Sequence, residues 1–271
     1  MAADHAAASP PPPGTADAFC RLPLLHGLPR AAADGLAARF APRMRWAEFA
    51  PGQSVVDFED ASTDVFFIAA GQVRIAVRTQ GGQELILEDL PAGGFFGDMA
   101  AIDGAARSAA VTALNRSRIG RLPGAEFLRM VSETPELAQR LMRILVQRLR
   151  LMNERMLDLT SLDIRHRLYA ELLRLAVPGT GCTRVISPPP MQHILASRIG
   201  ARREPVSREI AQLIREGLVE RTRGALVIVQ PAAISERIAN ARQGTHWPLV
   251  LSRAPAAKSK LDQRGTGFRE R

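Results

Sequence analysis

The chain has 271 residues, 46% of them hydrophobic, which is enough for two domains with buried cores, and its 2 cysteines are too few for a disulfide framework or a four-cysteine cluster. Its formal net charge of +9 is uneven: residues 1–164 hold 17 Arg and 19 Asp+Glu, whereas residues 165–271 hold 19 Lys+Arg and 8 Asp+Glu. A basic second half predicts a module that binds a polyanion, and the alternative is a solvated surface with a basic tail.

The N-terminal segment, "MAADHAAASPPPPG", has neither a basic start nor a long apolar run. It is therefore neither a signal peptide nor a membrane span, and we expect a cytoplasmic protein without a membrane partner. The proline and alanine content predicts disorder for residues 1–18.

Short apolar or alternating runs cut by glycine fill residues 46–122, among them "VFFIAAG", "VRIAVRT" and "ELILEDL". In "VRIAVR" the apolar Val73, Ile75 and Val77 recur at every second position, which predicts a strand with one buried face. Many short strands at regular spacing indicate a β-sandwich or jelly roll, which we place at residues 19–130.

One long helix is expected over residues 136–162, which contain neither proline nor glycine. Apolar residues recur there at alternating steps of three and four, as in the seam of a coiled coil: Met142, Leu145, Leu149, Met152, Met156 and Leu159. So narrow a seam favours a homodimer through a dimerisation helix at residues 131–164. The alternative is a helix packed on its own barrel.

The basic half begins with a helical stretch, "DIRHRLYAELLRLAV", followed by an expected loop, "PGTGCTRVISPPP". Residues 191–229 then predict a helix, a tight turn at Gly200 and a second helix with Pro205 in its first turn. A hairpin with Gly224 at its turn would form a wing, so residues 165–230 read as a winged helix-turn-helix. The buried stripe of the second helix is expected to consist of Val206, Ile210, Leu213 and Ile214.

Two stretches are the most specific. "GGFFGDMAAIDGAARSAAV", residues 93–111, is mostly small or apolar but holds one arginine, Arg107, followed by Ser108. "SRIGARREPVSREIAQLIREGLV" carries the tight turn and the second helix. The chain is α+β overall, and residues 231–271 form a basic extension whose first part could be a short helix and whose end is predicted to be disordered.

On these stretches, residues 20–230 resemble the cyclic-AMP receptor protein (catabolite activator)/fumarate-nitrate regulator family of bacterial transcription factors. The resemblance implies a cyclic-nucleotide-binding β-jelly-roll, a long dimerisation helix and a C-terminal winged helix-turn-helix. It implies a regulator whose ligand repositions the paired DNA-binding units across a homodimer, on a palindromic double-stranded DNA site. RNA polymerase is a further candidate partner.

The resemblance makes the glycine-rich stretch the cassette that binds the nucleotide phosphate. Arg107 would meet the phosphate through charge-assisted bonds, with Ser108 and backbone N–H groups completing the site. Asp98 stands where the family usually has Glu and would accept from the ribose hydroxyl, next to Gly97 and Met99. The purine would meet Met152 and Asn153, although Met152 also suits dimer packing. Cyclic AMP is the first candidate because it is the more frequent ligand in the family, and cyclic GMP is the alternative.

The same resemblance assigns DNA contacts to the second helix and the wing. In the major groove, arginine can donate hydrogen bonds to guanine and glutamate can accept one from cytosine. The alternative for Glu204 and Arg208 is an ordinary i,i+4 pair on the helix surface. The residues expected to bind DNA are Arg202, Arg203, Glu204, Ser207, Arg208, Arg221 and Arg223.

Other classes find less support in the sequence. An enzyme is disfavoured because there is no Gly-Lys pair for a P-loop, no HExxH and no GxSxG. The 5 histidines are isolated, so no metal is expected. A regulator of the same fold that is ligand-independent or senses cyclic di-GMP remains the alternative.

Overall fold

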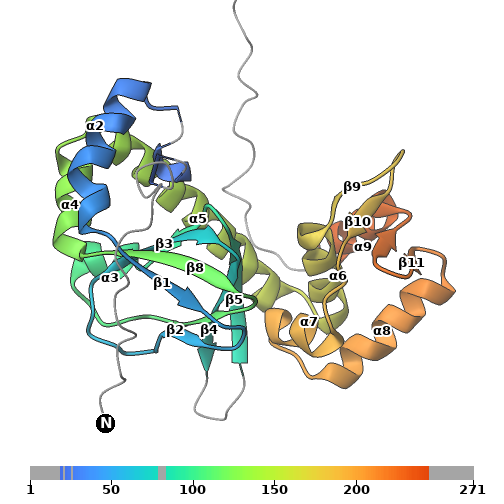
Figure 1. Ribbon diagram of the computed structural model, residues 1–271. Helices are drawn as coiled ribbons and strands as arrows, with labels where there is room; N and C mark the ends of the chain where they lie inside the picture. Colours follow the sequence, from blue (N-terminus) through green and yellow to red (C-terminus); the bar gives the residue numbers. More distant parts are fainter. Residues whose placement is uncertain (1–18, 21, 26, 79–83, 244–271) are drawn as a thin grey trace, which may run out of the picture.

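The computed structural model describes residues 19–20, 22–25, 27–78 and 84–243, which form two lobes joined by one long helix (Figure 1). The disorder predicted for residues 1–18 and for the end of the chain lies outside the described residues. Among the residues that are described, no helix is both long and apolar enough to cross a membrane.

The first lobe is a roll of two four-stranded antiparallel sheets, which confirms the predicted jelly-roll class. One sheet has the order β1-β8-β3-β6, with bounds Arg45–Phe49, Ser117–Leu122, Val65–Ala70 and Phe95–Phe96. The other has the order β2-β7-β4-β5, with bounds Ser54–Val56, Ala110–Ala113, Gln72–Arg78 and Glu84–Pro91.

The alternation predicted for β4 holds only in part. Val73 is buried as expected, but the next buried residue is Ala76, whereas Ile75 and Val77 are half-buried. The pairing of β4 with β5 shifts register between Ile75 and Ala76. Between the partners of these two residues β5 holds one residue more than β4, Leu87, so β5 is bulged opposite the point where the alternation of β4 changes.

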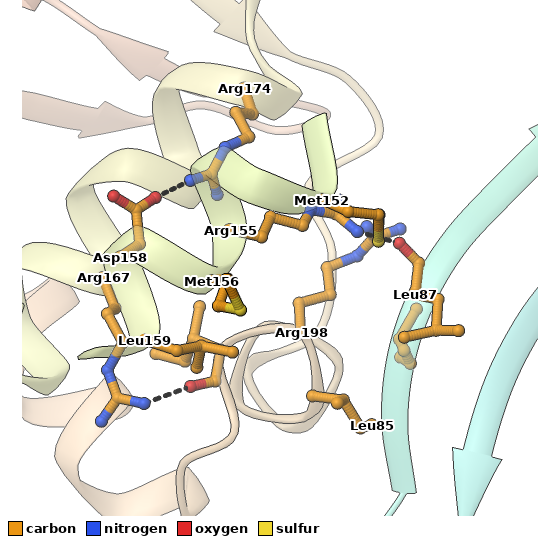
Figure 2. Close-up of a pocket in the computed structure, with 12 residues that line it drawn as sticks. Leu85, Leu87, Met152, Arg155, Met156, Asp158, Leu159, Arg167, Arg174 and Arg198 are labelled. Carbon is orange, nitrogen blue, oxygen red and sulfur yellow. Dashed lines mark hydrogen bonds and ion pairs between the residues drawn. The ribbon is translucent and has the colours of Figure 1, made fainter. Parts of the chain in front are cut away.

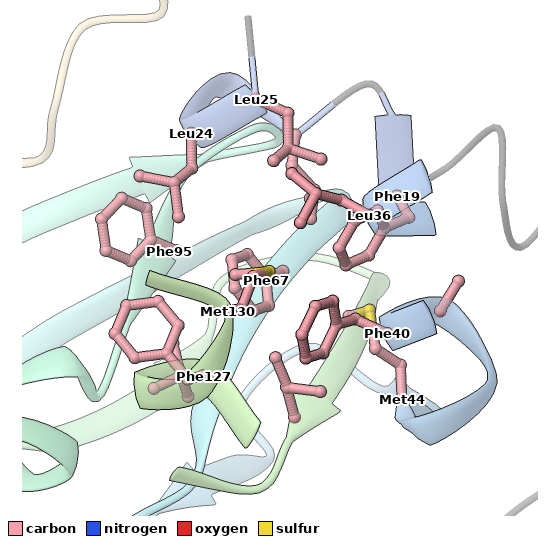
Figure 3. Packing of buried hydrophobic residues seen from close by; sticks show 14 of the residues in the cluster. Phe19, Leu24, Leu25, Leu36, Phe40, Met44, Phe67, Phe95, Phe127 and Met130 are labelled. Atoms are coloured by element: carbon pink, nitrogen blue, oxygen red, sulfur yellow. The ribbon is translucent and has the colours of Figure 1, made fainter. Parts of the chain in front are cut away.

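An aromatic cluster fixes the helices against the first sheet (Figure 3). Phe67 on β3 lies 6.0 Å from Phe95 and 6.4 Å from Phe127, measured between ring centroids. Phe40, at the end of helix α2, is fully buried in the same cluster. The helical elements that border this roll are η1 (Pro23–Leu25), α2 (Arg30–Phe40), η2 (Ala41–Arg43), α3 (Asp98–Asp103) and α4 (Gly124–Ser132).

The long helix α5 spans Pro135–Ser161, close to the predicted range. Its inner face packs on the roll through the buried Leu137 and Leu141. Leu145, assigned to the seam from its spacing, is half-buried on this inner face instead. The other seam residues are exposed along the single chain, as a surface that meets a second copy would be, and they are Met142, Leu149, Met152, Met156 and Leu159.

The second lobe contains the predicted helix-turn-helix. Helix α6 (Ile164–Leu175) starts at Asp163, whose carboxylate accepts from the backbone N–H of His166. Helices α7 (Gln192–Ile199) and α8 (Arg203–Arg215) are joined through Gly200, whose φ of +62° is left-handed and therefore favours glycine. On α8, Val206, Ile210 and Leu213 are buried, whereas Ile214 is 38% exposed and does not belong to the buried stripe.

The segment "PGTGCTRVISPPP" is not only a loop. It contributes the last residue of β9 (Val177–Pro178) and the whole of β10 (Arg184–Ile186) to a four-stranded sheet with the hairpin β11 (Val219–Arg221) and β12 (Leu226–Ile228), in the order β11-β12-β10-β9. β9 and β10 are too short to show a period of two and have no tight hairpin turn like that at Gly224, so they were not predicted.

The chain continues past the predicted boundary at residue 230 with helix α9 (Pro231–Gln243). Ile234 and Ile238 are buried in the same apolar cluster as α6, α7 and α8. The helix anticipated at the start of the extension is therefore part of the second lobe's core.

Candidate functional site

A left-handed glycine forms the turn at the heart of the glycine-rich stretch, which we call the cassette (residues 93–111). Gly97 follows β6 with a φ of +86° and precedes α3. A Cβ at this position would lie 2.6 Å from the carbonyl oxygen of Asp64 and 2.7 Å from Nη1 of Arg107. Glycine is thus required both by the backbone conformation and by the close approach of Arg107.

Arg107 is buried, with only 5% of its surface exposed, and donates to three acceptors. Its Nε and Nη2 lie 3.3 and 3.0 Å from Ser62 Oγ, Nη2 lies 2.7 Å from the Asp64 carbonyl, and Nη1 lies 3.2 Å from the Gly97 carbonyl. The guanidinium also faces the Phe66 ring, 5.5 Å from its centroid. We call this set of contacts the cradle.

All three acceptors in the cradle are neutral. Burial lowers the pKa of Arg107, and the charges of Asp60 and Asp64 raise it by less. The Asp64 carboxylate itself pairs with Arg121 at 3.1 Å. No ion pair joins Arg107 to a carboxylate among the described residues, so the cradle satisfies the guanidinium without cancelling its charge, as an anion site requires.

The loop before β3 supports the cradle, and the sequence analysis did not find it. The backbone N–H of Glu59 donates to the Arg107 carbonyl at 3.0 Å, and the N–H of Arg107 donates to the Asp60 carbonyl at 2.9 Å. Backbone pairing between segments more than 40 residues apart leaves no periodic signal, so only the structure reveals this loop as part of the site.

Asp98, expected to bind a ribose hydroxyl, is buried and already has a partner. Both of its carboxylate oxygens accept from Nη1 of Arg148 on α5, at 3.0 and 2.9 Å. Nη2 of Arg148 donates to the Phe95 carbonyl at 2.9 Å. The cassette is therefore joined directly to the long helix through a carboxylate that the sequence analysis assigned to ligand alone.

Arg148 was missed, although the sequence contains a signal for it. It follows the buried Leu141 by seven residues, so it lies on the inner face of α5 rather than on the seam. A charged residue on the buried face of a helix needs a buried partner, and Asp98 is that partner.

Two further cassette residues expected to bind the ligand are open to solvent. Ser108, next to Arg107, is exposed, and Met99 on α3 is 58% exposed. Their contacts with a ligand remain predictions.

Met152 and Asn153 lie on α5, one turn after Arg148. Met152 lines a cavity of about 150 Å³ between β5, α5 and α7, together with residues such as Leu85, Met156 and Ile199 (Figure 2). No residue of the cassette lines this cavity, and Asn153 is exposed. The contacts expected of Met152 and Asn153 with the purine remain predictions.

A chain of buried ion pairs, which we call the junction network, joins the lobes beside this cavity. Arg198 on α7, with a side chain 7% exposed, pairs with Asp89 on β5 and with Glu171 on α6. Asp89 also accepts from Arg74 at 2.8 and 2.9 Å. The network continues from Glu171 through Arg174 to Asp158 on α5. Carboxylates thus hold the first helix of the helix-turn-helix against the roll.

Helix α8 presents the residues expected to read DNA at its N-terminal end. Arg202 is its N-cap, and Arg202, Arg203, Glu204 and Arg208 are exposed, whereas Ser207 is half-buried. Within the described chain, no ion pair links Glu204 to Arg208, so the alternative of an i,i+4 surface pair is not formed.

A different charge on α8 anchors the helix. Glu209 accepts from Nε of Arg165 at 3.1 Å and from the hydroxyl of Tyr169, both on α6. Burial, together with the bond to Glu209, raises the pKa of Tyr169 to about 12. Glu209 therefore fixes the buried side of α8 and leaves the opposite side exposed. In the hairpin, Arg221 and Arg223 are exposed as expected of a wing.

The described residues hold no group of three or more His, Cys, Asp or Glu that could bind a metal ion. His166 contacts the Asp163 carboxylate through Nδ1 at 2.7 Å. Cys20 and Cys182 form no disulfide within the part of the chain that the structure describes.

Two families of domain match the chain in the order of its lobes. Residues 46–134 match the cyclic nucleotide-binding domain, and residues 166–237 match the Crp-like helix-turn-helix domain. The second match extends past residue 230 into α9, as the buried core does.

The chain is similar to known regulators over most of its length. It is 33% identical to the cyclic AMP receptor protein of Thermus thermophilus over 218 residues, covering 80% of this chain and 96% of that protein. It is 27% identical to the CRP-like cAMP-activated global transcriptional regulator of Mycobacterium tuberculosis, covering 82% and 96%. The c-di-GMP-responsive global regulator CLP of Xanthomonas campestris shares the fold, with a TM-score of 0.61 at 18% identity over 72% of this chain and 98% of that one.

Proposed function

Because the chain belongs to the cyclic-AMP receptor protein family of transcription regulators, we propose that it is a DNA-binding regulator that responds to a cyclic nucleotide. The nucleotide would bind in the roll and reposition the helix-turn-helix pair across a dimer. A palindromic operator would then be bound.

The observation that carries the nucleotide assignment is the neutral cradle of Arg107. A buried guanidinium held by Ser62 and two backbone carbonyls keeps a full positive charge, which one phosphate of a cyclic nucleotide would compensate. Ser108 follows directly and is exposed, so its hydroxyl could complete a phosphate site.

Cyclic AMP is the proposed nucleotide, since the Thermus thermophilus relative is named as a cyclic AMP receptor and the Mycobacterium tuberculosis relative as cAMP-activated, and cyclic GMP is the alternative. Asp98 would have to exchange Arg148 for the ribose hydroxyl, or share its oxygens between the two. Ligand entry would in that case act directly on α5 through Arg148. The positions of Met152 and Asn153 on α5 suggest that any base contact requires the dimer or a shift of the helix.

The proposed DNA reader is the N-terminal end of α8, with Arg203, Glu204 and Arg208 facing base edges. Arg202 and Ser207 would support these contacts. The wing arginines, Arg221 and Arg223, would bind backbone phosphates without base preference.

We further propose a homodimer through the exposed seam of α5. Five apolar side chains of one helix face are at least 39% exposed, which a soluble helix face rarely tolerates unless a partner covers it. Replacing Leu149 and Met156 by Glu would place like charges in this seam, so light scattering should show a dimer for the wild type and a monomer for the double variant.

The decisive experiment measures binding of the full chain to a palindromic DNA selected from a random library. Fluorescence anisotropy is recorded without ligand and with cyclic AMP, cyclic GMP or cyclic di-GMP. Binding that strengthens with a cyclic mononucleotide supports the proposal. Tight DNA binding that no ligand changes would show a ligand-independent regulator. DNA binding that responds to cyclic di-GMP alone would show a cyclic di-GMP sensor.

Two further aspects follow from this role. A regulator that binds chromosomal DNA works in the cytoplasm, and one that activates transcription would contact RNA polymerase. Binding DNA and contacting RNA polymerase do not require catalysis, and the relatives named above are regulators rather than enzymes.

A further inference from the structure

Ser62 contributes the single side-chain acceptor that the described residues give to the Arg107 guanidinium. The two other acceptors are the backbone carbonyls of Asp64 and Gly97, which no substitution of a side chain removes. The residue at position 62 is therefore the one whose side chain determines which acceptor the guanidinium has besides the two carbonyls. No family pattern used above involves this residue.

The hydroxyl occupies a particular edge of the guanidinium. Ser62 Oγ bridges Nε and Nη2 of Arg107, and this is the edge on which a carboxylate or phosphate binds as a fork. At 3.3 and 3.0 Å the two bonds are longer than those between a guanidinium and a charged carboxylate or phosphate oxygen, which are about 2.7–2.9 Å. The hydroxyl thus holds the guanidinium in place weakly, on the edge where an anion would bind strongly.

The chemistry of the residue at position 62 has opposite consequences for stability and for binding. A carboxylate there would bond the same edge more strongly and cancel the charge of Arg107. A methyl group would leave two N–H groups without an acceptor in a side chain that is almost fully buried. A neutral acceptor is the one choice that orients the guanidinium and preserves its charge.

We propose that Ser62 is a positioning residue for nucleotide binding, which holds Arg107 in orientation while leaving its charge available to the ligand phosphate. This inference rests on the proposed function, because it assigns Arg107 to the phosphate of a cyclic nucleotide. It extends the site to the loop before β3, which lies outside the cassette.

The sharpest test compares Ser62→Asp with Ser62→Asn, two side chains of nearly equal size that differ in charge. Calorimetric titration of cyclic AMP and of cyclic GMP into the full chain should show a loss of at least about 30-fold for Ser62→Asp, because its carboxylate takes the place of the phosphate. Ser62→Asn should bind at least about tenfold more tightly than Ser62→Asp. In the absence of ligand, Ser62→Asp should unfold at the higher temperature of the two.

The second pair tests the hydroxyl itself. Ser62→Ala should weaken nucleotide binding by about five- to tenfold, and Ser62→Thr, which keeps a hydroxyl, should restore it to within about threefold of the wild type. Ser54→Ala is the matched control, since Ser54 lies on β2 and donates to Asp57 at 2.7 Å, away from the cradle. Its affinity should equal that of the wild type.

A merely structural role for Ser62 would move stability and affinity in the same direction, whereas the proposal requires Ser62→Asp to raise one and lower the other. If the wild type binds a cyclic nucleotide and the Asp and Ala variants bind it equally well, this inference is overturned and the proposed function stands. If the wild type binds neither nucleotide, the nucleotide response and this inference fail together.

Discussion

Buried arginines occur in two regions of this molecule, and the two regions hold them in opposite ways. In the cassette, Arg107 is surrounded by a hydroxyl, two carbonyls and an aromatic ring. Between the lobes, Arg198 and Arg174 are bonded to carboxylates. A guanidinium among neutral acceptors retains an uncompensated charge and is suited to binding an anion, whereas one among carboxylates is a structural link.

Arg148 shares features of both regions and could couple the cassette to the junction network. It is a carboxylate-paired arginine like those of the junction network, but its partner Asp98 belongs to the cassette. A ligand that competes for Asp98 would loosen α5, and α5 also carries Asp158 of the junction network. The physical route from nucleotide to DNA-binding lobe would therefore run through ion pairs rather than through the apolar core.

The largest expected effect is a loss of ligand affinity when Arg107, the arginine held by neutral acceptors, is replaced. Arg107→Ala should weaken cyclic-nucleotide binding by at least about 30-fold, since losing a charge-assisted anchor to a buried phosphate costs about 2–5 kcal/mol. Calorimetric titration measures this, and circular dichroism should show an intact fold. Arg121→Ala is the control, because Arg121 pairs with Asp64 beside the cradle without entering it. Unchanged affinity in Arg107→Ala would remove Arg107 from the site.

Replacing an arginine of the junction network, which is bonded to carboxylates, should mainly lower the free energy of unfolding. Arg198→Ala leaves Asp89 and Glu171 with one arginine each, so the free energy of unfolding should fall by about 2–3 kcal/mol, less than the 3–5 typical of a fully broken buried pair. Denaturant titration of the full chain provides the measurement.

The matched control for Arg198 is Arg30→Ala, which removes a surface i,i+4 pair with Asp34 whose arginine is 95% exposed. That variant should stay within about 0.5 kcal/mol of the wild type. An Arg198→Ala protein that is equally stable would mean that the junction network does not hold the lobes together.

The sequence predicted the features that depend on local pattern. The tight turn at Gly200, the unbroken α5 and the buried stripe of Val206, Ile210 and Leu213 on α8 all carry such signals. Features that depend on pairing between distant segments were not predictable: the bulge of β5 against β4, the cradle contact of Ser62 and the pairing of Arg198 with Asp89. Arg148 lies between these groups, because its place on the inner face of α5 could have been inferred but its partner could not.

A smaller effect should show how closely the cradle is packed. Gly97→Ala and Gly104→Ala both place alanine at a positive φ, which costs about 1–2 kcal/mol each. A Cβ at Gly104 meets nothing within 4 Å, whereas one at Gly97 collides with Asp64 and Arg107. Gly97→Ala should therefore be less stable than Gly104→Ala by about 1 kcal/mol and should bind nucleotide about tenfold more weakly. Equal losses in the two variants would mean that backbone strain alone accounts for Gly97.

The smallest expected effect is a pH dependence confined to the junction network. Burial alone would raise the pKa of Asp89, but the hydrogen bonds and charges of Arg74 and Arg198 together hold that pKa below its usual value. A lowered pKa means that the stabilisation is fully present above the pKa of the unfolded chain, about 3.9, and is lost as the pH falls through the folded value. Asp89→Asn should thus cost about 1 kcal/mol at pH 7, because a neutral acceptor replaces a charged one. Measured as the difference in unfolding free energy between wild type and variant from pH 7 to pH 3, this cost should stay level down to about pH 4 and shrink below it. A difference that is constant across the range would show that the charge of Asp89 does not contribute to holding the lobes together.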